Sequence, residues 1–350
     1  MADVARSAGV SVMTVSRVLS GTTGVADSTR SRVEHAVAAL GYYTNTAARV
    51  LAGGRSRTIG VLAVETQQFG PSHMLFGIEA AARAAGHLLS FVTLGPGGAH
   101  DIRSTLEHLG ASHVEGVIVV APVREVLDAV KVLEDHLPLV VVGGDPSINA
   151  ATVTIDQLAG ARLITRHLLD LGHATVHHVR GPREWIDAEV RSRGWSDTLR
   201  RHGARRPKAL VGDWEPGGGY AAGLSLAADP AVTAIFAAND QTALGVLRAL
   251  RQHGRRVPED VSLVGFDDTP EAAYLVPSLT TVRQDFGEVG RRCVELVLSL
   301  IEGDAPVQHI IVPAELVVRE SSAPPPGSSA RATKPKTEDA QQTPAARRPG

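Results

Sequence analysis

The sequence has a single cysteine and few aromatic residues, and it has no long hydrophobic run. Cys293 alone cannot form an intramolecular disulfide framework, which excludes a small disulfide-stabilised scaffold. The longest apolar runs, such as 117–121 and 137–142, have the length of strands and are far too short to span a bilayer. The amino terminus lacks the long apolar core of a secretion signal. We therefore expect a cytoplasmic protein without a membrane segment.

The chain also lacks the short motifs that mark common enzyme chemistries. It has no G-x-S-x-G nucleophile elbow, no G-x-x-x-x-G-K-[ST] phosphate loop and no H-E-x-x-H metal pair, and the glycines of 95–98 do not fit a dinucleotide loop. His173, His177 and His178 flank a predicted strand, where histidines more often form a half-buried set than a metal site. We predict no enzyme activity, no cofactor and no metal.

Two short amphipathic helices joined at Gly9 stand at the amino terminus, within residues 3–20. Val4 and Ala8 lie four apart on one face of the first helix, and Ser11 is placed to cap the second. The second helix has an inward apolar stripe formed by Val15, Val18 and Leu19. Its opposite face carries Val12, Met13, Ser16 and Arg17. An exposed face of this kind can lie in a major groove, so the pair is typical of a helix-turn-helix.

A third helix is predicted to begin near Asp27 and to stop at Gly41, with Val33, Val37 and Leu40 buried. The distribution of charge supports a DNA-binding head. Residues 1–57 hold seven arginines against three acidic side chains, a formal charge of +4, whereas the whole chain carries −2. The remainder therefore carries −6, as expected when only the head meets phosphates.

From residue 58 onward, strand-like apolar runs alternate with helical ones. The predicted strands are 59–64, 88–94, 114–120, 139–142, 176–179, 234–237 and 263–266. The predicted helices are 72–85, 102–109, 123–136, 158–171, 187–202, 218–228, 242–252 and 286–302. Such alternation indicates an α/β fold with parallel sheets covered on both faces, and two such sets indicate two lobes.

The sequence DVARSAGVSVMTVSRVLSG, followed by VADSTRSRVEHAVAALGYYTNTAARVLAGGRSRTIGVL, resembles the amino-terminal part of the LacI/GalR (lactose-repressor) family of bacterial transcription regulators. The resemblance continues to about residue 321. It implies an all-α helix-turn-helix head at 1–43, a hinge helix and linker at 44–56, and a two-lobed body at 57–321. The body is expected to have the periplasmic-binding-protein-like fold, with doubly wound parallel sheets.

Within the body, the first lobe is expected at about 57–155 and 286–313, and the second at about 156–283 and 314–321. Residues 322–350 are rich in proline, serine and alanine and hold almost no large apolar side chain. Such a segment cannot bury a core, so we expect a disordered tail.

The resemblance also implies how the head meets DNA. Arg17 is the best candidate for reading guanine, because arginine can bond guanine O6 and N7 together. Val12 and Met13 match the family's specificity positions, and the residues placed to contact phosphates are Thr14, Ser16 and Asn45. Family members usually carry several residues before the aspartate that Asp3 matches, so we expect the natural start to lie upstream of Met1.

In the family, a hinge helix orders on the operator and a leucine wedges between base pairs in the minor groove. Leu51 matches that leucine, and Ala48 lies one turn before it. On length alone, residues 44–54 are too short for a stable isolated helix, which without the resemblance favours a flexible linker whose Leu51 packs on the body.

Effector-binding residues are implied in the loops at the edges of the lobes. Those of the first lobe are Phe69, Pro71 and Ser72, and the others are Trp185, Asp187, Arg191, Trp214, Asn239, Asp240, Asp267, Gln284 and Phe286. The tryptophans suit stacking on the apolar face of a sugar ring, while Arg191 and Asp267 suit charge-assisted bonds to hydroxyls. The alternative is that the tryptophans only pack in the core and that Asp240 only caps a helix.

We therefore predict a nucleoid-associated, homodimeric repressor of palindromic double-stranded operator DNA, released by a small sugar or glycoside. The tail carries no leucine heptad, which favours a dimer over a tetramer. Two alternatives stay open. One is a regulator of the same fold whose ligand strengthens operator binding, and the other is a sugar-binding protein without a DNA function.

Overall fold

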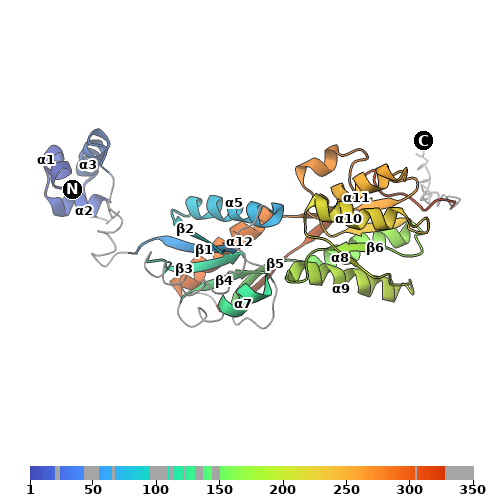
Figure 1. The fold of residues 1–350 in the computed structure, drawn as a ribbon. Coiled ribbons are helices and arrows are strands. Elements are labelled where there is room, and N and C mark those ends of the chain that lie inside the picture. The colour runs from blue at the N-terminus through green and yellow to red at the C-terminus, as the bar shows by residue number, and fades with distance from the viewer. Residues whose placement is uncertain are drawn as a thin grey trace, which may run out of the picture.

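The computed structural model describes residues 1–19, 24–42, 55–64, 68–94, 109, 113–120, 123–130, 137–143, 150–303 and 306–327. Figure 1 shows three packed units in chain order: a small helical head, a first α/β lobe and a second α/β lobe. Across the described residues, no helix is both long and apolar enough to cross a membrane. The hinge residues Asn45, Ala48 and Leu51, the predicted helix up to residue 108 and the tail from 328 onward lie outside the described residues.

The head consists of α1 (Ala2–Ala8), α2 (Val12–Leu19) and α3 (Asp27–Ala39). Val4, Val15 and Val33 are fully buried where the three helices meet. The backbone N–H of Thr14 donates to Oγ of Ser11 at 3.1 Å, so the predicted cap of the second helix is confirmed. Gly9 takes the left-handed conformation at the end of α1, with φ of 62°, which lets the chain turn sharply into α2.

The prediction that Leu40 is buried is wrong, because its side chain is 49% exposed. The helix α3 ends at Ala39, and Ala36 fills the inward position one turn after Val33. Gly41 then reverses the chain with φ of 55°, and Tyr42 packs against the head core in the place expected for Leu40. The predicted apolar stripe therefore does not extend to Leu40, because the helix ends one residue before it.

The first lobe is built on a parallel six-stranded sheet in the order β11-β5-β4-β3-β1-β2. Its strands are β1 (Thr58–Val64), β2 (Leu88–Leu94), β3 (Gly116–Val120), β4 (Leu139–Val142), β5 (Ala151–Ile155) and β11 (His309–Val312). The helices α5 (Phe69–Ala84) and α12 (Phe286–Glu302) pack on each other and share one core with the sheet, and α7 (Arg124–Val130) covers the other core. Burial on both faces explains the uninterrupted apolar sequences of β3 and β4.

The second lobe has a parallel sheet in the order β7-β6-β8-β9. Its strands are β6 (His177–Arg180), β7 (Leu210–Val211), β8 (Ala234–Ala237) and β9 (Ser262–Val264). One face is covered by α8 (Gln157–Asp170) and α9 (Ile186–Arg201), and the other by α10 (Pro216–Ala227) and α11 (Asp240–Gln252). Two helical layers around a parallel sheet in each lobe confirm the predicted α/β architecture.

The chain crosses between the lobes three times, from β5 into α8, from β10 (Thr281–Gln284) into α12, and from β11 into β12 (Ala314–Val317). The strands β10 and β12 pair in antiparallel fashion next to the second lobe. The sequence pattern did not predict β5, β7, β10, β11 or β12, because these strands are short or mix polar with apolar residues. They matter for the site, because the crossings set where the two lobes face each other.

Candidate functional site

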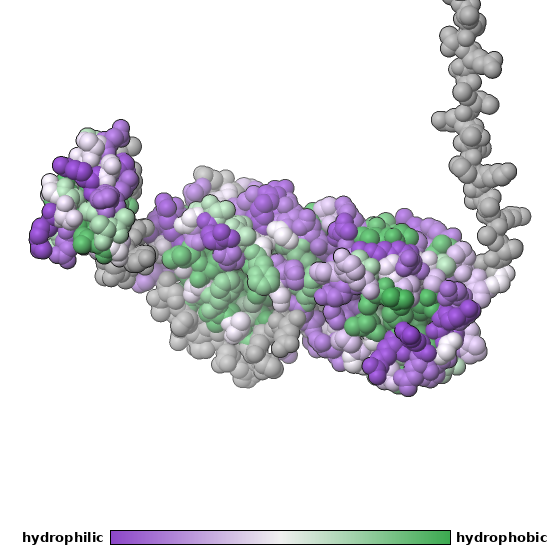
Figure 2. Space-filling model, turned by 90° about the horizontal axis from the view of Figure 1, so that it is seen from above, coloured by the Kyte–Doolittle hydropathy of each residue, from purple (hydrophilic) through white to green (hydrophobic). Residues whose placement is uncertain are grey.

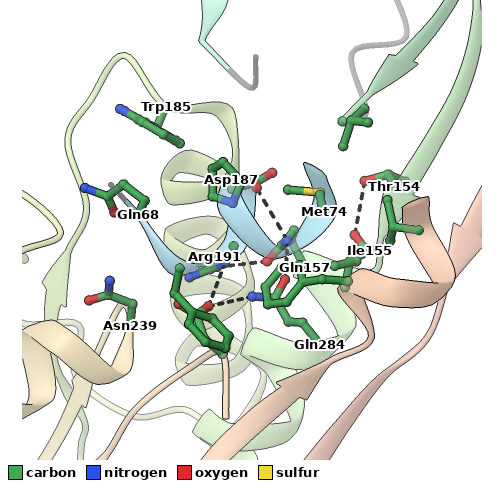
Figure 3. A pocket seen from close by; sticks show the side chains of 18 of the residues that line it. Gln68, Met74, Thr154, Ile155, Gln157, Trp185, Asp187, Arg191, Asn239 and Gln284 are labelled. Atoms are coloured by element: carbon green, nitrogen blue, oxygen red, sulfur yellow. Dashed lines mark hydrogen bonds and ion pairs between the residues drawn. The ribbon is translucent and has the colours of Figure 1, made fainter. Parts of the chain in front are cut away.

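A cleft between the lobes lies at the carboxyl ends of the strands, with about 620 Å³ of empty space when the part open to solvent is counted. Among the residues predicted to bind an effector, those that line it are Phe69, Pro71, Trp185, Asp187, Arg191, Trp214, Asn239, Asp267, Gln284 and Phe286. Figure 3 shows several of their side chains pointing toward one another from both lobes. Residues far apart in the sequence therefore form one concave site.

Two predicted residues do not line the cleft. Ser72 lies in the first turn of α5 outside the lining, and Asp240 is buried behind it. The cap of α11 is Asn239, whose side chain accepts from the N–H of Thr242 at 2.8 Å, so the alternative in which Asp240 caps the helix is wrong. Asp240 is the first residue of the helix, and its carboxylate turns toward Thr281.

The polar wall of the cleft is a closed ring of four buried side chains. Nε of Arg191 donates to Gln157 at 2.8 Å, and Nε2 of Gln157 donates to Gln284 at 2.7 Å. Nε2 of Gln284 donates to Oδ1 of Asp267 at 2.5 Å, and Nη2 of Arg191 lies 3.5 Å from the same oxygen. Every member contacts two others, so the ring fixes the orientation of each side chain (Figure 3).

The Arg191 guanidinium is fixed by further contacts. Nη1 donates to the carbonyl of Ala238 at 2.5 Å, and the guanidinium lies over the ring of Phe266 with its carbon 3.9 Å from the centroid. Stacking on an aromatic face and hydrogen bonding in the ring plane suit a planar guanidinium. The charge is therefore held at one position at the floor of the cleft.

Burial raises the pKa of the Asp267 carboxyl to about 6, although Arg191 and the hydrogen bond from Gln284 act in the opposite direction. Burial likewise raises the pKa of Asp187, against the pull of Arg191. A group that donates a hydrogen bond to either carboxylate would stabilise its ionised form and lower its pKa.

Trp214 forms a side wall and has an unusual backbone. Its φ is 71°, and the side chain of Asn239 donates to its carbonyl oxygen at 3.0 Å. Its indole packs directly on Gly181, where a Cβ would overlap the ring. Trp185 meets it edge to face, with the ring centroids 5.7 Å apart. Both tryptophans predicted to stack on a ligand therefore stand together at the cleft.

The opposite wall belongs to the first lobe and is apolar. Phe69 and Phe286 meet edge to face with centroids 5.8 Å apart. The lining residues that sequence reasoning missed are Gln68, Gly70, Met74, Val142, Gly143, Thr154, Ile155, Gln157 and Val289. Several of them follow the carboxyl ends of strands, where ligands bind in parallel sheets. The sequence predicted β4, so the residues after it could have been proposed, but it did not predict β5.

The lobes also touch each other beside the cleft. Val123 and Trp185 form an isolated β-bridge, and the ion pair between Arg124 and Glu189 spans 2.7 Å. On another strand end, Nε2 of Gln68 donates to Glu215 at 3.4 Å. These contacts join the first lobe to the second, so any change in lobe separation must break or remake them.

The exposed face of α2 agrees with the predicted reading surface. Val12 is 48% exposed and Met13 is 68% exposed, and Ser16 and Arg17 are also exposed. Thr14 is half-buried and its hydroxyl lies 2.8 Å from that of Ser11. The helix therefore presents apolar side chains and one arginine on the same surface.

Of the three histidines that flank the predicted strand, His173 and His178 have structural partners. His173 contacts the hydroxyls of Thr233 and Ser262, each at 3.0 Å. His178 is stacked on Phe236, and burial lowers its pKa to about 4. Within the described ranges, no three His, Cys, Asp or Glu side chains are grouped as metal ligands.

A helix-turn-helix head joined to two lobes that enclose a polar cleft defines a ligand-responsive DNA-binding regulator. A model of the bacterial regulatory proteins of the lacI family matches residues 1–45, and a model of the periplasmic binding protein-like domain matches residues 165–322. The lactose operon repressor of Escherichia coli (strain K12) is 32% identical over 326 residues, covering 92% of this chain and 90% of that protein.

Two solved structures are similar over most of their length. The lac repressor dimer bound to operator and the anti-inducer ONPF has a TM-score of 0.85 at 31% identity, covering 92% of this chain and 98% of that one. The transcriptional regulator CelR in complex with cellobiose has a TM-score of 0.69 at 31% identity, covering 91% and 98%. The chain belongs to the lacI family. It is a DNA-binding transcription regulator, and the family is not enzymatic.

Proposed function

We propose that the protein is a dimeric repressor that leaves a palindromic operator when a small sugar or glycoside enters the cleft. The observation that carries the proposal is the division of the cleft into a polar wall and an apolar wall. A sugar presents hydroxyls at its edge and C–H groups on its faces, so it matches both walls at once. The ring of Arg191, Gln157, Gln284 and Asp267 supplies donors and acceptors for the hydroxyls.

The apolar wall and the tryptophans supply the rest of the fit. Trp214 and Trp185 offer aromatic faces for the C–H side of a sugar ring, and Phe69 and Phe286 offer a surface for a second ring or an apolar aglycone. CelR was solved with cellobiose, a glycoside of two sugar rings. We infer a neutral glycoside as the class of ligand for the cleft of this protein.

In the head, we propose that α2 lies in the major groove. Arg17 reads guanine, Val12 and Met13 contact thymine methyl groups, and Thr14 and Ser16 bind phosphates. The exposure of Val12 and Met13 supports this proposal, because exposed apolar side chains on a helix are costly unless a partner covers them. We also propose that Asn45, Ala48 and Leu51 form the minor-groove hinge.

We propose a homodimer formed through the face that both lobes share. Large apolar side chains are exposed there on α5, at the end of η3 (Pro270–Tyr274) and just after it: Phe76 is 70% exposed, Tyr274 is 86% exposed and Val276 is 82% exposed. Figure 2, which views the molecule from above α5 and α10, shows hydrophobic surface on both lobes of this face. A two-fold dimer would cover both patches with one symmetric interface.

Sedimentation of the full chain tests the dimer. We expect wild-type protein to sediment as a dimer and the double variant Tyr274→Asp with Val276→Asp as a folded monomer. Val318→Asp, at another exposed valine, is the matched control and should stay dimeric. A wild-type monomer at micromolar concentration would overturn the dimer.

The ligand proposal is tested with a mobility-shift titration at fixed salt, because affinity for DNA depends steeply on salt. The probe is the duplex that wild-type protein selects from a random pool, and cellobiose, lactose, galactose and isopropyl glycosides are added in turn. We expect at least one glycoside to weaken binding. If every sugar leaves the affinity unchanged, the inducer proposal is wrong; if a sugar strengthens it, the ligand acts as a corepressor.

A further inference from the structure

Glu115 holds the segment that joins the head to the body. This segment, residues 55–57, is called the connector. The backbone N–H of Arg57 donates to Oε1 of Glu115 at 2.9 Å, and Nε of Arg55 donates to Oε2 at 3.1 Å. The hydroxyl of Ser56 donates to Oε1 at 3.4 Å. One carboxylate therefore binds all three residues of the connector, and its side chain is only 13% exposed.

The connector also has an unusual backbone conformation. Arg57 has φ of 50°, a left-handed conformation that a residue with a Cβ rarely adopts. The N–H of Glu115 donates to the carbonyl of Thr58 at 2.9 Å, and the N–H of Thr58 donates to Oγ of Ser56 at 3.2 Å. This conformation is thus held from both sides, and among the described residues Glu115 is the only acceptor for the N–H of Arg57.

The strands attached to this clamp lead to the cleft. The connector runs into β1, Glu115 immediately precedes β3, and the two strands are neighbours in the sheet with Ile59 opposite Gly116. Beyond the carboxyl end of β1, Gln68 contacts Glu215 of the second lobe at 3.4 Å. Beyond that of β3, Val123 bridges to Trp185. The same pair of strands therefore holds the connector at one end and meets the second lobe at the other (Figure 1).

We propose that Glu115 is a positioning residue for operator binding, which fixes the direction in which the connector leaves the first lobe. A rigid connector passes a rotation of the first lobe to the residues before it, whereas a loose one absorbs that rotation. The proposal deepens the repressor function proposed above. Its tests use DNA and a protease without any sugar, so they can fail independently of the inducer.

The first test compares operator affinity in full-length variants at fixed salt. The probe is the duplex selected by wild-type protein, and a scrambled duplex measures non-specific binding. Glu115→Ala should weaken the specific complex about tenfold, the size expected for losing bonds to a charged acceptor, with non-specific binding unchanged. Glu115→Gln keeps an oxygen for the N–H of Arg57 and should lose less. Glu295→Ala removes another arginine-paired carboxylate of the first lobe and should behave as wild type.

The second test reports on the connector itself. Trypsin cleaves after arginine, and cleavage requires an extended backbone that the bound connector cannot take up. In Glu115→Ala, cleavage after Arg55 and Arg57 should become about tenfold faster, as expected for the same lost bonds. Cleavage after Arg49 in the same molecule is the internal reference and should keep its rate.

The outcomes separate a positioning role from a purely structural one. Weaker specific binding with selective cleavage at the connector supports the proposal, and partial rescue by Glu115→Gln supports it further. Wild-type operator affinity in Glu115→Ala overturns it, even if the melting temperature falls. Equal acceleration of cleavage at all three arginines, with Glu115→Gln as damaged as Glu115→Ala, also overturns it, because that pattern reports general unfolding.

Discussion

Nη2 of Arg191 lies 3.5 Å from Oδ1 of Asp267, with both side chains at most 9% exposed. The two opposite charges compensate each other at the floor of the cleft, which a deeply buried ion pair requires. A ligand that enters exchanges water for an ordered set of donors and acceptors. The consequences of altering this floor and the elements around it can be measured.

Replacing Arg191 by methionine should abolish effector binding and destabilise the second lobe. Removing Arg191 leaves the buried Asp267 carboxylate without its counter-charge, which typically costs about 3 kcal/mol or more. Calorimetric titration with the active glycoside and urea unfolding measure the two effects. The control is Arg193→Met, on the exposed side of the same helix, which should change neither. Normal effector affinity in Arg191→Met would show that the guanidinium does not bind the effector.

Adding a methyl group at Gly181 should disable the cleft with little effect on the operator complex. The new Cβ would overlap the indole of Trp214, so the indole must move into the cleft or out of its wall. We expect Gly181→Ala to lower effector affinity by at least tenfold, of the order of ~1–2 kcal/mol for displaced packing. Gly217→Ala, where a Cβ meets nothing within 4 Å, is the control. Equal effector affinity in both variants would contradict a role for the Trp214 position.

Effector binding should change the fluorescence of two of the three tryptophans. Trp185 and Trp214 line the cleft, whereas Trp195 lies in the core of the second lobe with Nε1 donating to Val176 at 2.9 Å. We expect Trp195→Phe to keep the full ligand-induced spectral change and Trp214→Phe to lose most of it. A change that disappears only with Trp195 would show that ligand binds elsewhere.

Asp240 should make stability fall as pH rises from about 4 to about 8. Burial, followed by the nearby Asp267 charge, raises the pKa of Asp240 from its ordinary 3.8 to about 8. Between these pKa values the folded protein keeps a proton that the unfolded chain has lost. The free energy of unfolding therefore falls by up to ~1.4 kcal/mol for each unit that the pH rises. The contribution of the protonated Asp240 to stability is complete below about pH 4 and is lost as the pH rises through the folded pKa of about 8.

Asp240→Asn removes this titration and retains an oxygen that can accept from the N–H of Thr269. Its free energy of unfolding relative to wild type should therefore be larger at pH 8 than at pH 5, as measured by urea denaturation. Asp229→Asn, at an exposed carboxylate, provides the reference. Parallel pH profiles for wild type and Asp240→Asn would show that Asp240 ionises normally in the fold.

Much of the site was predictable because the family resemblance implies ligand-binding residues in the loops at the lobe edges, and tryptophan, arginine and aspartate suit that role. A tryptophan, an arginine and an aspartate beside strand ends stand out in a chain with only three tryptophans. Gln157 did not stand out, since a glutamine after an unpredicted strand has no local feature. Its role comes from distant partners, Arg191 and Gln284, which only the crossing of the lobes brings within hydrogen-bond distance.

The sequence by itself determined the head and the α/β class of the body. Helical periodicity, the Ser11 cap and the glycine at position 9 are local features, so they can be recognised in the sequence without knowledge of the fold. Tertiary structure alone decided that Tyr42 and not Leu40 closes the head core, that Asp240 turns away from the cleft, and that Glu115 holds the connector. Each of these depends on which distant groups compete for one space or one donor, and that is settled only when the chain is packed.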